Sequence, residues 1–281
     1  MKFFAAILTL GFCLAAGSSA ARAQAQGPVA PPPKYEVKRL PVAPDPKAPP
    51  VPAEEIIKRF AANEDLMKKA YDGFAFNQVI RVKEMSDPGG EFVVTGEMYM
   101  KSDGQRYERI VKQPVSTLKQ TAFTLEDVKT FVSLPLFVLT SDQIANYKLK
   151  YEGTEKLDEL NTYIFRVQPA QLDRKRRFFD GVIWVDNQEF AIVKSSGKFV
   201  SEIESEGNRL PFTMFDTYRE NIAGKYWFPT YISSDDFISE PGGQNIPLHL
   251  VVRSTDFQPN PIAVPASQPA TAPTLAPKKP S

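Results

Sequence analysis

The single histidine is the first residue to test for catalysis, because an imidazole is the commonest general base in enzymes. His249 lies in an alternating run in which Leu248, Leu250 and Val252 share one face, so the histidine lies on the other face with Arg253. This position predicts a surface or half-buried strand residue. A Ser-His-Asp or Cys-His arrangement would depend on this one imidazole, and zinc sites built from the usual histidine and cysteine ligands are excluded.

Acidic side chains offer a second kind of chemistry, because two carboxylates at a set separation hydrolyse glycosidic bonds. The candidates are Asp186, Asp235, Asp236, Glu202, Glu204 and Glu206. Acids of this kind are most often exposed, so a carboxylate-dependent hydrolase is the third of our hypotheses for function. The chain has no P-loop or dinucleotide fingerprint. We predict no enzyme activity, no catalytic residue, no cofactor and no metal site.

A basic run, Arg174-Lys175-Arg176-Arg177, stands directly before two phenylalanines. A solvated loop is the plain interpretation of this run, and contact with anionic headgroups or an acidic partner is the alternative. The chain as a whole has 34 basic and 33 acidic side chains. That balance gives no electrostatic basis for binding nucleic acid, so we exclude this partner.

The first residues have the layout of a secretory signal peptide. Lys2 precedes an apolar run from Phe3 to Ala16, and Ala21-Arg22-Ala23 forms a cleavage site of small residues. The apolar run is shorter than the roughly 20 residues that cross a bilayer. We therefore predict cleavage after this segment, a periplasmic location, and no transmembrane segment in the mature chain.

The only cysteine, Cys13, lies inside this apolar run. Phe12 stands where a lipid-anchoring motif needs a small residue, so we do not expect a lipoprotein anchor at Cys13. The mature chain then has neither a thiol nor a disulfide, although it enters an oxidising compartment. Its stability must come from burial of apolar side chains.

Prolines cluster towards the two ends and divide the chain into four parts. After the signal peptide, residues 1–23, we predict a proline-rich disordered tail over residues 24–51. A second disordered tail, rich in proline and alanine, is predicted over residues 259–281. Residues 52–258 have globular composition and no internal linker, which predicts a single domain.

The globular part begins with an amphipathic helix. Pro52 suits the first helical position, and Glu54 and Glu55 place negative charge at the positive end of the helix dipole. Apolar residues then recur at three- and four-residue spacing as far as Phe74. Such a helix has one apolar face that another part of the fold must cover.

Beyond Gly73 the pattern alternates with a period of two, which predicts antiparallel strands joined by short turns. We predict strands within residues 74–83, 92–100, 106–112, 147–151, 162–167, 178–185, 190–199, 212–220, 226–232 and 247–257. A sheet of about ten strands curls or closes as its twist accumulates. The predicted fold class is mainly β (α+β), with a strongly curved antiparallel sheet, or incomplete β-barrel, whose concave face is covered by helices.

Two short helices and one apolar connection interrupt the strands. Thr124 and Thr140 each begin a capping-box pattern, with Asp127 and Gln143 three residues later. The run 131–139 between them is predicted to be a buried loop or a covering segment.

Large rings and methionines gather in the predicted strands. As a plain interpretation they form the core, but polarizable methionine beside aromatic rings also suits a cavity for an acyl chain. The candidate cavity residues are Phe76, Phe92, Val94, Met98, Met100, Phe165, Trp184, Met214 and Trp227.

Two strand motifs resemble those of a known family. Residues 178–186 (FFDGVIWVD), followed by 191–194 (AIVK), and residues 224–230 (GKYWFPT) resemble the outer-membrane lipoprotein-sorting proteins, relatives of the carriers LolA and LolB. The motif positions are Gly181, Trp184, Asp186, Trp227 and Pro229. The likeness in strand order extends over residues 54–257.

The resemblance implies an incomplete, curved barrel closed by helices, with an apolar cavity for the acyl chains of a lipoprotein or another lipid. It also implies a strand arginine that bonds to the covering helices, for which Arg81, Arg106 and Arg166 are the candidates. Our leading hypothesis is a periplasmic carrier that binds lipid or lipoprotein, with lipoprotein-sorting components as further partners. The alternative is an envelope sensor that binds a partner protein, as relatives of the RseB type do.

Overall fold

In the computed structural model, the described residues are 48–100, 106–132, 137–174, 176–201, 211–239 and 243–260. The predicted signal peptide, nearly all of the first predicted tail, most of the second, and the series Glu202, Glu204 and Glu206 lie outside these ranges. Helices and strands run from Ala53 to Pro259. No helix of the described part is both long enough and apolar enough to span a membrane.

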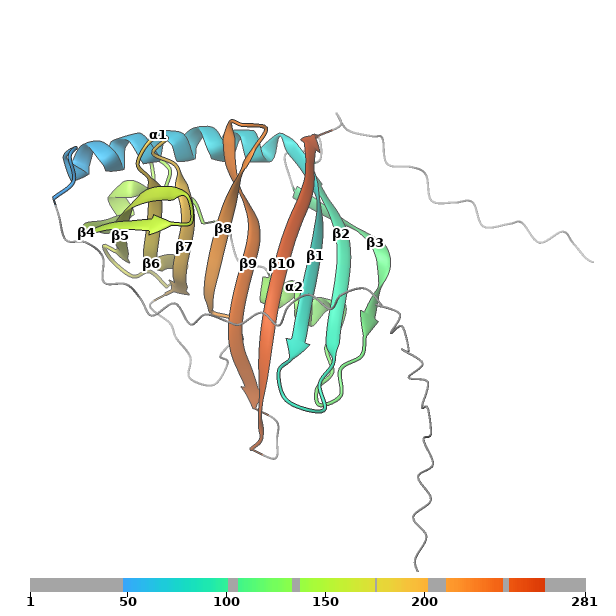
Figure 1. The fold of residues 1–281 in the computed structure, drawn as a ribbon. Coiled ribbons are helices and arrows are strands. Elements are labelled where there is room, and N and C mark those ends of the chain that lie inside the picture. The colour runs from blue at the N-terminus through green and yellow to red at the C-terminus, as the bar shows by residue number, and fades with distance from the viewer. Residues whose placement is uncertain are drawn as a thin grey trace, which may run out of the picture. The chain divides into compact units, whose positions relative to one another are not determined.

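Ten strands form one antiparallel sheet (Figure 1). The strands are β1 (Phe74–Glu84), β2 (Glu91–Met100), β3 (Arg106–Ser116), β4 (Tyr147–Leu157), β5 (Leu160–Pro169), β6 (Phe178–Asp186), β7 (Ile192–Val200), β8 (Met214–Ile222), β9 (Tyr226–Ser239) and β10 (Asn245–Pro259). Their order in the sheet is β3-β2-β1-β10-β9-β8-β7-β6-β5-β4. The sheet is open, with β3 and β4 at its edges, and the predicted mainly β, antiparallel fold is confirmed.

One connection differs from the others because it joins the two edges of the sheet. β3 and β4 are consecutive in the chain but lie at opposite ends of the strand order. The chain between them contains α2 (Leu125–Val132) and the short helix η1 (Ile144–Asn146). Val128 of α2 and the later Phe137 and Leu139 are all buried in the hydrophobic core. This connection therefore lies over one face of the sheet.

The first helix lies over the same face. α1 (Ala53–Asp72) confirms the predicted helix, although Pro52 caps it instead of occupying its first position and the helix ends before Gly73; Figure 1 shows α1 crossing the strands. Its buried apolar residues Ile56, Phe60 and Met67 follow the three- and four-residue spacing of one helix face. Leu66, on another face of the same helix, is 61% exposed.

The core consists of three clusters of apolar side chains. The N-terminal half of α1 packs with Phe137, Leu139 and the inward residues of β5 to β8. α2 packs on β1, β2 and β10 through Val128. The C-terminal end of α1 packs on Phe76 and Phe228. The clusters lie on one face of the sheet, which we call the inner face, and the opposite face is the outer face.

Local patterns locate most elements correctly. Thr124 and Asp127 form the predicted capping box, since Thr124 N–H donates to Asp127 at 2.8 Å and Asp127 N–H donates to Thr124 at 3.1 Å. The second predicted short helix is a single turn at η1. The hairpin of β4 and β5 is much longer than predicted and turns at Asp158, whose φ is 52°.

Candidate functional site

The candidate site is the inner face of the sheet together with the parts of the chain that cover it. We call α1 and the described residues 117–132 and 137–146 the cover. Phe60 and Ile56 of the cover are fully buried against the sheet, and the Phe60 ring meets Phe165 of β5 edge-on at 5.8 Å. The cover is therefore part of the core and not a loose flap.

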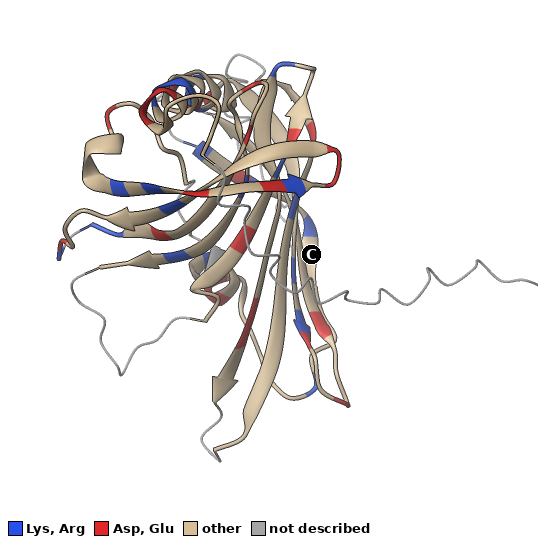
Figure 2. Ribbon diagram, turned by 60° about the vertical axis from the view of Figure 1, so that its left-hand side comes forward, with Lys and Arg blue, Asp and Glu red and all other residues tan. Residues whose placement is uncertain are grey.

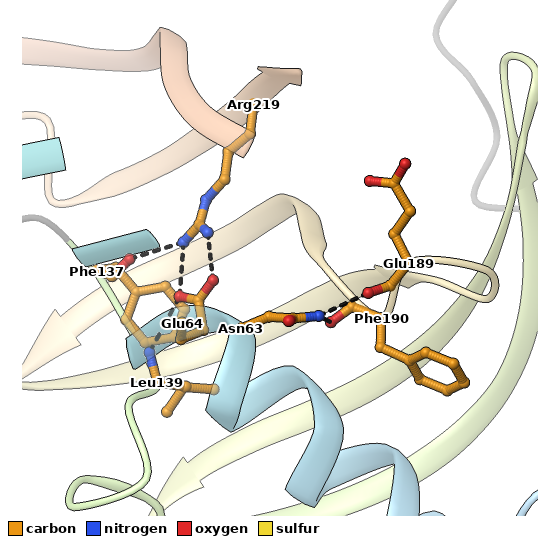
Figure 3. Close-up of polar contacts among 7 residues, drawn as sticks. All are labelled: Asn63, Glu64, Phe137, Leu139, Glu189, Phe190 and Arg219. Carbon is orange, nitrogen blue, oxygen red and sulfur yellow. Dashed lines mark hydrogen bonds and ion pairs between the residues drawn. The ribbon is translucent and has the colours of Figure 1, made fainter. Parts of the chain in front are cut away.

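A buried ion pair joins the cover to the sheet (Figure 3). Arg219 of β8 donates to both carboxylate oxygens of Glu64, at 2.6 and 3.1 Å, and each side chain is only 2% exposed. Arg219 also donates to the carbonyl of Phe137 at 3.0 Å, and Leu139 N–H donates to Glu64 at 3.3 Å. The pair thus connects α1, residues 137–139 and the sheet at one point.

Residues on either side of Glu64 extend this connection. Asn63 donates to the carbonyls of Glu189 and Phe190 in the β6–β7 turn, at 2.6 and 3.0 Å (Figure 3). Asp65 accepts hydrogen bonds from both the N–H and the hydroxyl of Ser141, at 3.1 and 2.6 Å. Asn63 and Glu64 therefore tie α1 to the sheet, and Asp65 ties it to the other part of the cover.

The buried Glu64–Arg219 pair specifies where the cover lies more than it stabilises the closed form. Removing two charges from water costs several kcal/mol per ion, and their attraction offsets this cost only while the bidentate geometry holds. A cover that moved off the sheet would return both groups to water. The pair therefore specifies one closed position for the cover while adding little to the net free energy of closing it.

A second buried acid holds the beginning of the cover. The carboxylate of Glu84, at the end of β1, accepts hydrogen bonds from the N–H groups of Lys119, Gln120 and Thr121, at 2.9, 2.7 and 2.9 Å. Burial by itself would raise the pKa of Glu84, but these backbone donors and that of Gly90 outweigh it and lower the pKa below the ordinary value of 4.5.

Replacing Glu84 by glutamine is expected to lower the free energy of unfolding by about 1–3 kcal/mol at pH 7, because charged hydrogen bonds to buried amides are lost. The folded-state pKa of Glu84 lies below its unfolded value. Its contribution is therefore complete above the unfolded pKa and disappears as pH falls through the folded one. Urea unfolding from pH 7 to pH 3 should show the two proteins converging below about pH 4.5.

The exposed Glu54→Gln variant is the control for Glu84→Gln, and its effect should stay within about 0.5 kcal/mol. A difference between Glu84→Gln and the wild type that persisted unchanged to pH 3 would contradict this role for the carboxylate.

The C-terminal end of α1 has its own polar contact. The Arg106 guanidinium of β3 donates to the carbonyl of Tyr71 at 2.9 Å and lies over the Tyr71 ring at 4.6 Å. Burial raises the pKa of Tyr71 to about 12. The hydroxyl therefore stays neutral at physiological pH, and the ring is part of the core.

The arginine that joins the cover to the sheet differs from most of the predicted candidates. Arg81 pairs with Glu91, and Arg166 pairs with Asp180, both within the sheet. Arg106 does contact α1, as described above. The arginine with the buried connection is Arg219, which the sequence prediction missed.

A signal for the pair was present in the sequence. Glu64 continues the apolar spacing of Phe60 and Met67 on the buried face of α1. Arg219 likewise continues the inward positions Phe215 and Thr217 of β8. An acid on the buried face of α1 and a base at an inward position of β8 predict that Glu64 and Arg219 pair in the core.

The predicted cavity residues lie in different places. Phe165 is in the cluster beneath the N-terminal half of α1, Phe92 and Val94 are in the cluster beneath α2, and Phe76 is in the cluster at the end of α1. Met98 packs against this last cluster. That these side chains line one cavity stays a prediction.

Four further candidates lie away from these clusters. Trp184 is half-buried on the outer face, where its indole N–H donates to Glu155 at 2.8 Å. The indole of Trp227 donates to Glu189 at 2.6 Å. Met214 is 53% exposed, and Met100 is half-buried near the end of β2.

The remaining motif residues have structural reasons for their identity. A Cβ atom at Gly181 would lie 2.3 Å from the carbonyl oxygen of Ser196 and 2.5 Å from the Phe179 ring, so only glycine fits there. Asp186 accepts hydrogen bonds from the N–H groups of Gln188 and Glu189, at 3.1 and 2.7 Å, and so shapes the β6–β7 turn. Pro229 lies opposite Arg219 across β8 and β9.

The candidate catalytic groups that the structure describes are His249, Asp186, Asp235 and Asp236. His249 Nδ1 lies 2.7 Å from Asp235 Oδ1, and no hydroxyl of the described residues is bonded to the imidazole. Asp236 accepts a hydrogen bond from the N–H of Phe212 at 2.9 Å. Within the described ranges, no three histidine, cysteine or acidic side chains gather as metal ligands.

Comparison with known proteins gives structural matches only. No protein-family model matches the chain, and no curated protein matches it. A LolA superfamily protein from Nitrosomonas europaea matches with 16% identity and a TM-score of 0.36, over 76% of this chain and 96% of that one. An outer membrane lipoprotein-sorting protein domain from Vibrio parahaemolyticus matches with 10% identity and a TM-score of 0.36, over 74% and 93% of the chains.

A third match is the complex of MucA and MucB from Pseudomonas aeruginosa, with 11% identity and a TM-score of 0.22, over 74% of this chain and 99% of that one.

Proposed function

We propose that this protein is a periplasmic carrier that binds the acyl chains of a lipid or lipoprotein on the inner face of its sheet, beneath the cover. It acts by burying and releasing these chains and not by breaking bonds. The observation that carries the proposal is the buried Glu64–Arg219 pair, which holds the cover over an apolar surface of the sheet.

The cover can leave without unfolding the sheet, because each strand is bonded to its neighbours by its own ladder. α1 and the described residues 117–132 and 137–146 add no strand to the sheet. The described polar links between the cover and the sheet are spread along its length: Asn63, Glu64 and Tyr71 of α1, residues 117–121 at the start of the connection, Lys129 of α2, and Gln143 and Asn146 near its end. Movement of the cover would therefore expose apolar surface by breaking these links, while the ladders between the strands stay intact.

The surface beneath the N-terminal half of α1 suits an acyl chain. Phe165 of β5, Phe179 and Ile183 of β6, and Phe215 of β8 are buried there in one apolar cluster. Each buried methylene contributes about 0.8 kcal/mol. Eight methylenes would contribute about 6 kcal/mol, which corresponds to a Kd on the order of 10 µM before the cost of displacing the cover.

In the closed form the cover's own side chains occupy this surface. Phe60 and Ile56 of α1, with Phe137 and Leu139 of the connection, fill the space over β5 to β8. A cavity of about 490 Å³ lies elsewhere, at the β1–β2 turn, and is lined mainly by polar residues such as Lys83, Asp87 and Glu91. An acyl chain would bind by replacing the cover's side chains and not by entering that cavity.

Photo-crosslinking with a diazirine analogue of palmitate tests this proposal on the wild-type protein. We expect saturable labelling that unlabelled palmitate competes away, with mass spectrometry placing the label on peptides that contain Phe165, Ile183 or Phe215. Phe215 on the inner face and Met214 on the outer face lie in the same peptide. The labelled position must therefore be assigned to a single residue. Labelling confined to exposed residues such as Leu66 and Met214, or no competition by palmitate, would overturn the proposal.

A further inference from the structure

The outer face of β4 to β7 carries a group of basic side chains that the proposed function does not use. We call these side chains the basic patch: Lys148 and Lys150 of β4, Arg166 of β5, Lys194 and Lys198 of β7, and Arg174, Arg176 and Arg177 of the β5–β6 connection. The basic residues of the strands alternate with residues of the core, so they face away from the cover, whereas Arg176 of the connection donates to Gln143 of the cover at 3.4 Å.

Strand pairing brings these residues together from distant parts of the sequence. Lys150 lies opposite Arg166, and Lys198 lies opposite Asp180 of β6. From β4 to β7 the patch spans three strand spacings, about 14 Å. Figure 2 shows basic bands on neighbouring strands at the left of the view, interrupted by an acidic band.

Nearby acids neutralise only part of the patch. Asp180 pairs with Arg166, and Asp173 accepts a hydrogen bond from the backbone N–H of Arg176. Lys148, Lys150 and Lys198 form no ion pair with any acid of the described residues. The whole chain is nearly neutral, with 34 basic and 33 acidic residues, so the patch is a local concentration of charge.

Aromatic and apolar side chains border the patch on the same face. Lys194 lies between Trp184 and Tyr218, with its ammonium 4.5 and 4.9 Å from the two ring centroids. Leu172, in the connection that carries the arginines, is 49% exposed, and Met214 beside Lys198 is 53% exposed. Rings of this kind, with one apolar and one wet side, favour membrane–water interfaces.

We infer that the basic patch docks the protein on an anionic membrane surface through lipid phosphates. Each lysine or arginine near such a surface contributes about 1 kcal/mol, which is about fivefold in binding. The rings and exposed apolar side chains that border the patch favour a lipid surface over an acidic protein, because such side chains concentrate at membrane–water interfaces. Docking through the outer face leaves the cover free, so this inference goes beyond the proposed function.

Vesicle sedimentation tests the inference with the full chain. Vesicles of phosphatidylglycerol and phosphatidylethanolamine should bind the wild type, and vesicles of phosphatidylcholine should not. The triple variant Lys148→Gln/Lys150→Gln/Lys198→Gln should bind the anionic vesicles on the order of a hundredfold more weakly. The control Lys58→Gln/Lys68→Gln/Lys69→Gln removes the same charge from α1 and should bind as the wild type does.

Three results would overturn the inference: no binding of the wild type to anionic vesicles, equal binding to neutral vesicles, or equal losses in the two triple variants. Patch-dependent binding of poly-glutamate without vesicle binding would assign the patch to an acidic protein instead. None of these outcomes depends on acyl-chain labelling of the inner face, so the two proposals fail separately.

Discussion

Replacing Arg219 by methionine is expected to lower the free energy of unfolding by about 3–5 kcal/mol, because it leaves the Glu64 carboxylate buried without its partner. The carbonyl of Phe137 loses its donor in the same variant. Replacing Glu64 by leucine should have a comparable effect, since the guanidinium then remains buried and uncompensated. Urea unfolding at pH 7 measures both variants.

The double variant Glu64→Leu/Arg219→Met should recover most of this loss, because an apolar pair of similar volume replaces a buried ion pair at little net cost. The control is the exposed pair of Glu55 and Arg59 on the same helix, bonded at 2.8 Å. Since exposed helical pairs contribute only about 0.3–0.5 kcal/mol, Arg59→Gln should be nearly neutral.

If Arg219→Met and Glu64→Leu each lowered the free energy of unfolding by less than about 1 kcal/mol, the two charged groups would be in contact with water in solution. The cover would then not be held as we describe. A double variant as unstable as the singles would show that the hydrogen bonds to Phe137 and Leu139, and not the charges, hold the cover.

Replacing Phe60 by alanine is expected to cost about 3–5 kcal/mol, through lost burial and the cavity left against Phe165. Phe60 is fully buried. Leu66→Ala is the matched control, because the same helix carries this side chain largely exposed, and its effect should stay within about 0.5 kcal/mol. Equal effects of the two substitutions would contradict the packing of α1 on the inner face.

The Phe60→Ala variant also tests whether an acyl chain binds beneath α1. If an acyl chain replaces Phe60 on the sheet, removal of the ring lowers the cost of binding, and palmitate should stabilise Phe60→Ala more than the wild type. A ligand at 100 times its Kd stabilises a protein by about 2.7 kcal/mol. Thermal unfolding with and without palmitate measures the difference, and an equal shift in both proteins would contradict binding beneath α1.

Elements whose signal lies within a few neighbouring residues could be predicted from the sequence. The helix after Pro52 and the capping box at Thr124 depend on neighbours within a few residues, so their signals are complete in the sequence. The inward Leu248, Leu250 and Val252 of β10 were separated correctly from His249, because polar and apolar residues alternate there.

Strands that are apolar on both faces could be located from the sequence, but the face that points to the core could not be predicted. In residues 178–186, Phe179 and Ile183 alternate with Val182 and Trp184, so periodicity alone does not say which set faces the core. The structure places Phe179 and Ile183 inward and Trp184 outward. The cover lies over only one face, and that choice depends on where the chain passes from β3 to β4.

The antiparallel β class followed from the sequence by itself, because short-range periodicity decides it; the secretory leader stays a prediction. The meeting of Glu64 with Arg219, the bonding of Glu84 to the cover and the gathering of the basic patch were decided only by the tertiary structure. Each joins residues far apart in the chain, and the order of strands in the sheet determines which of them become neighbours.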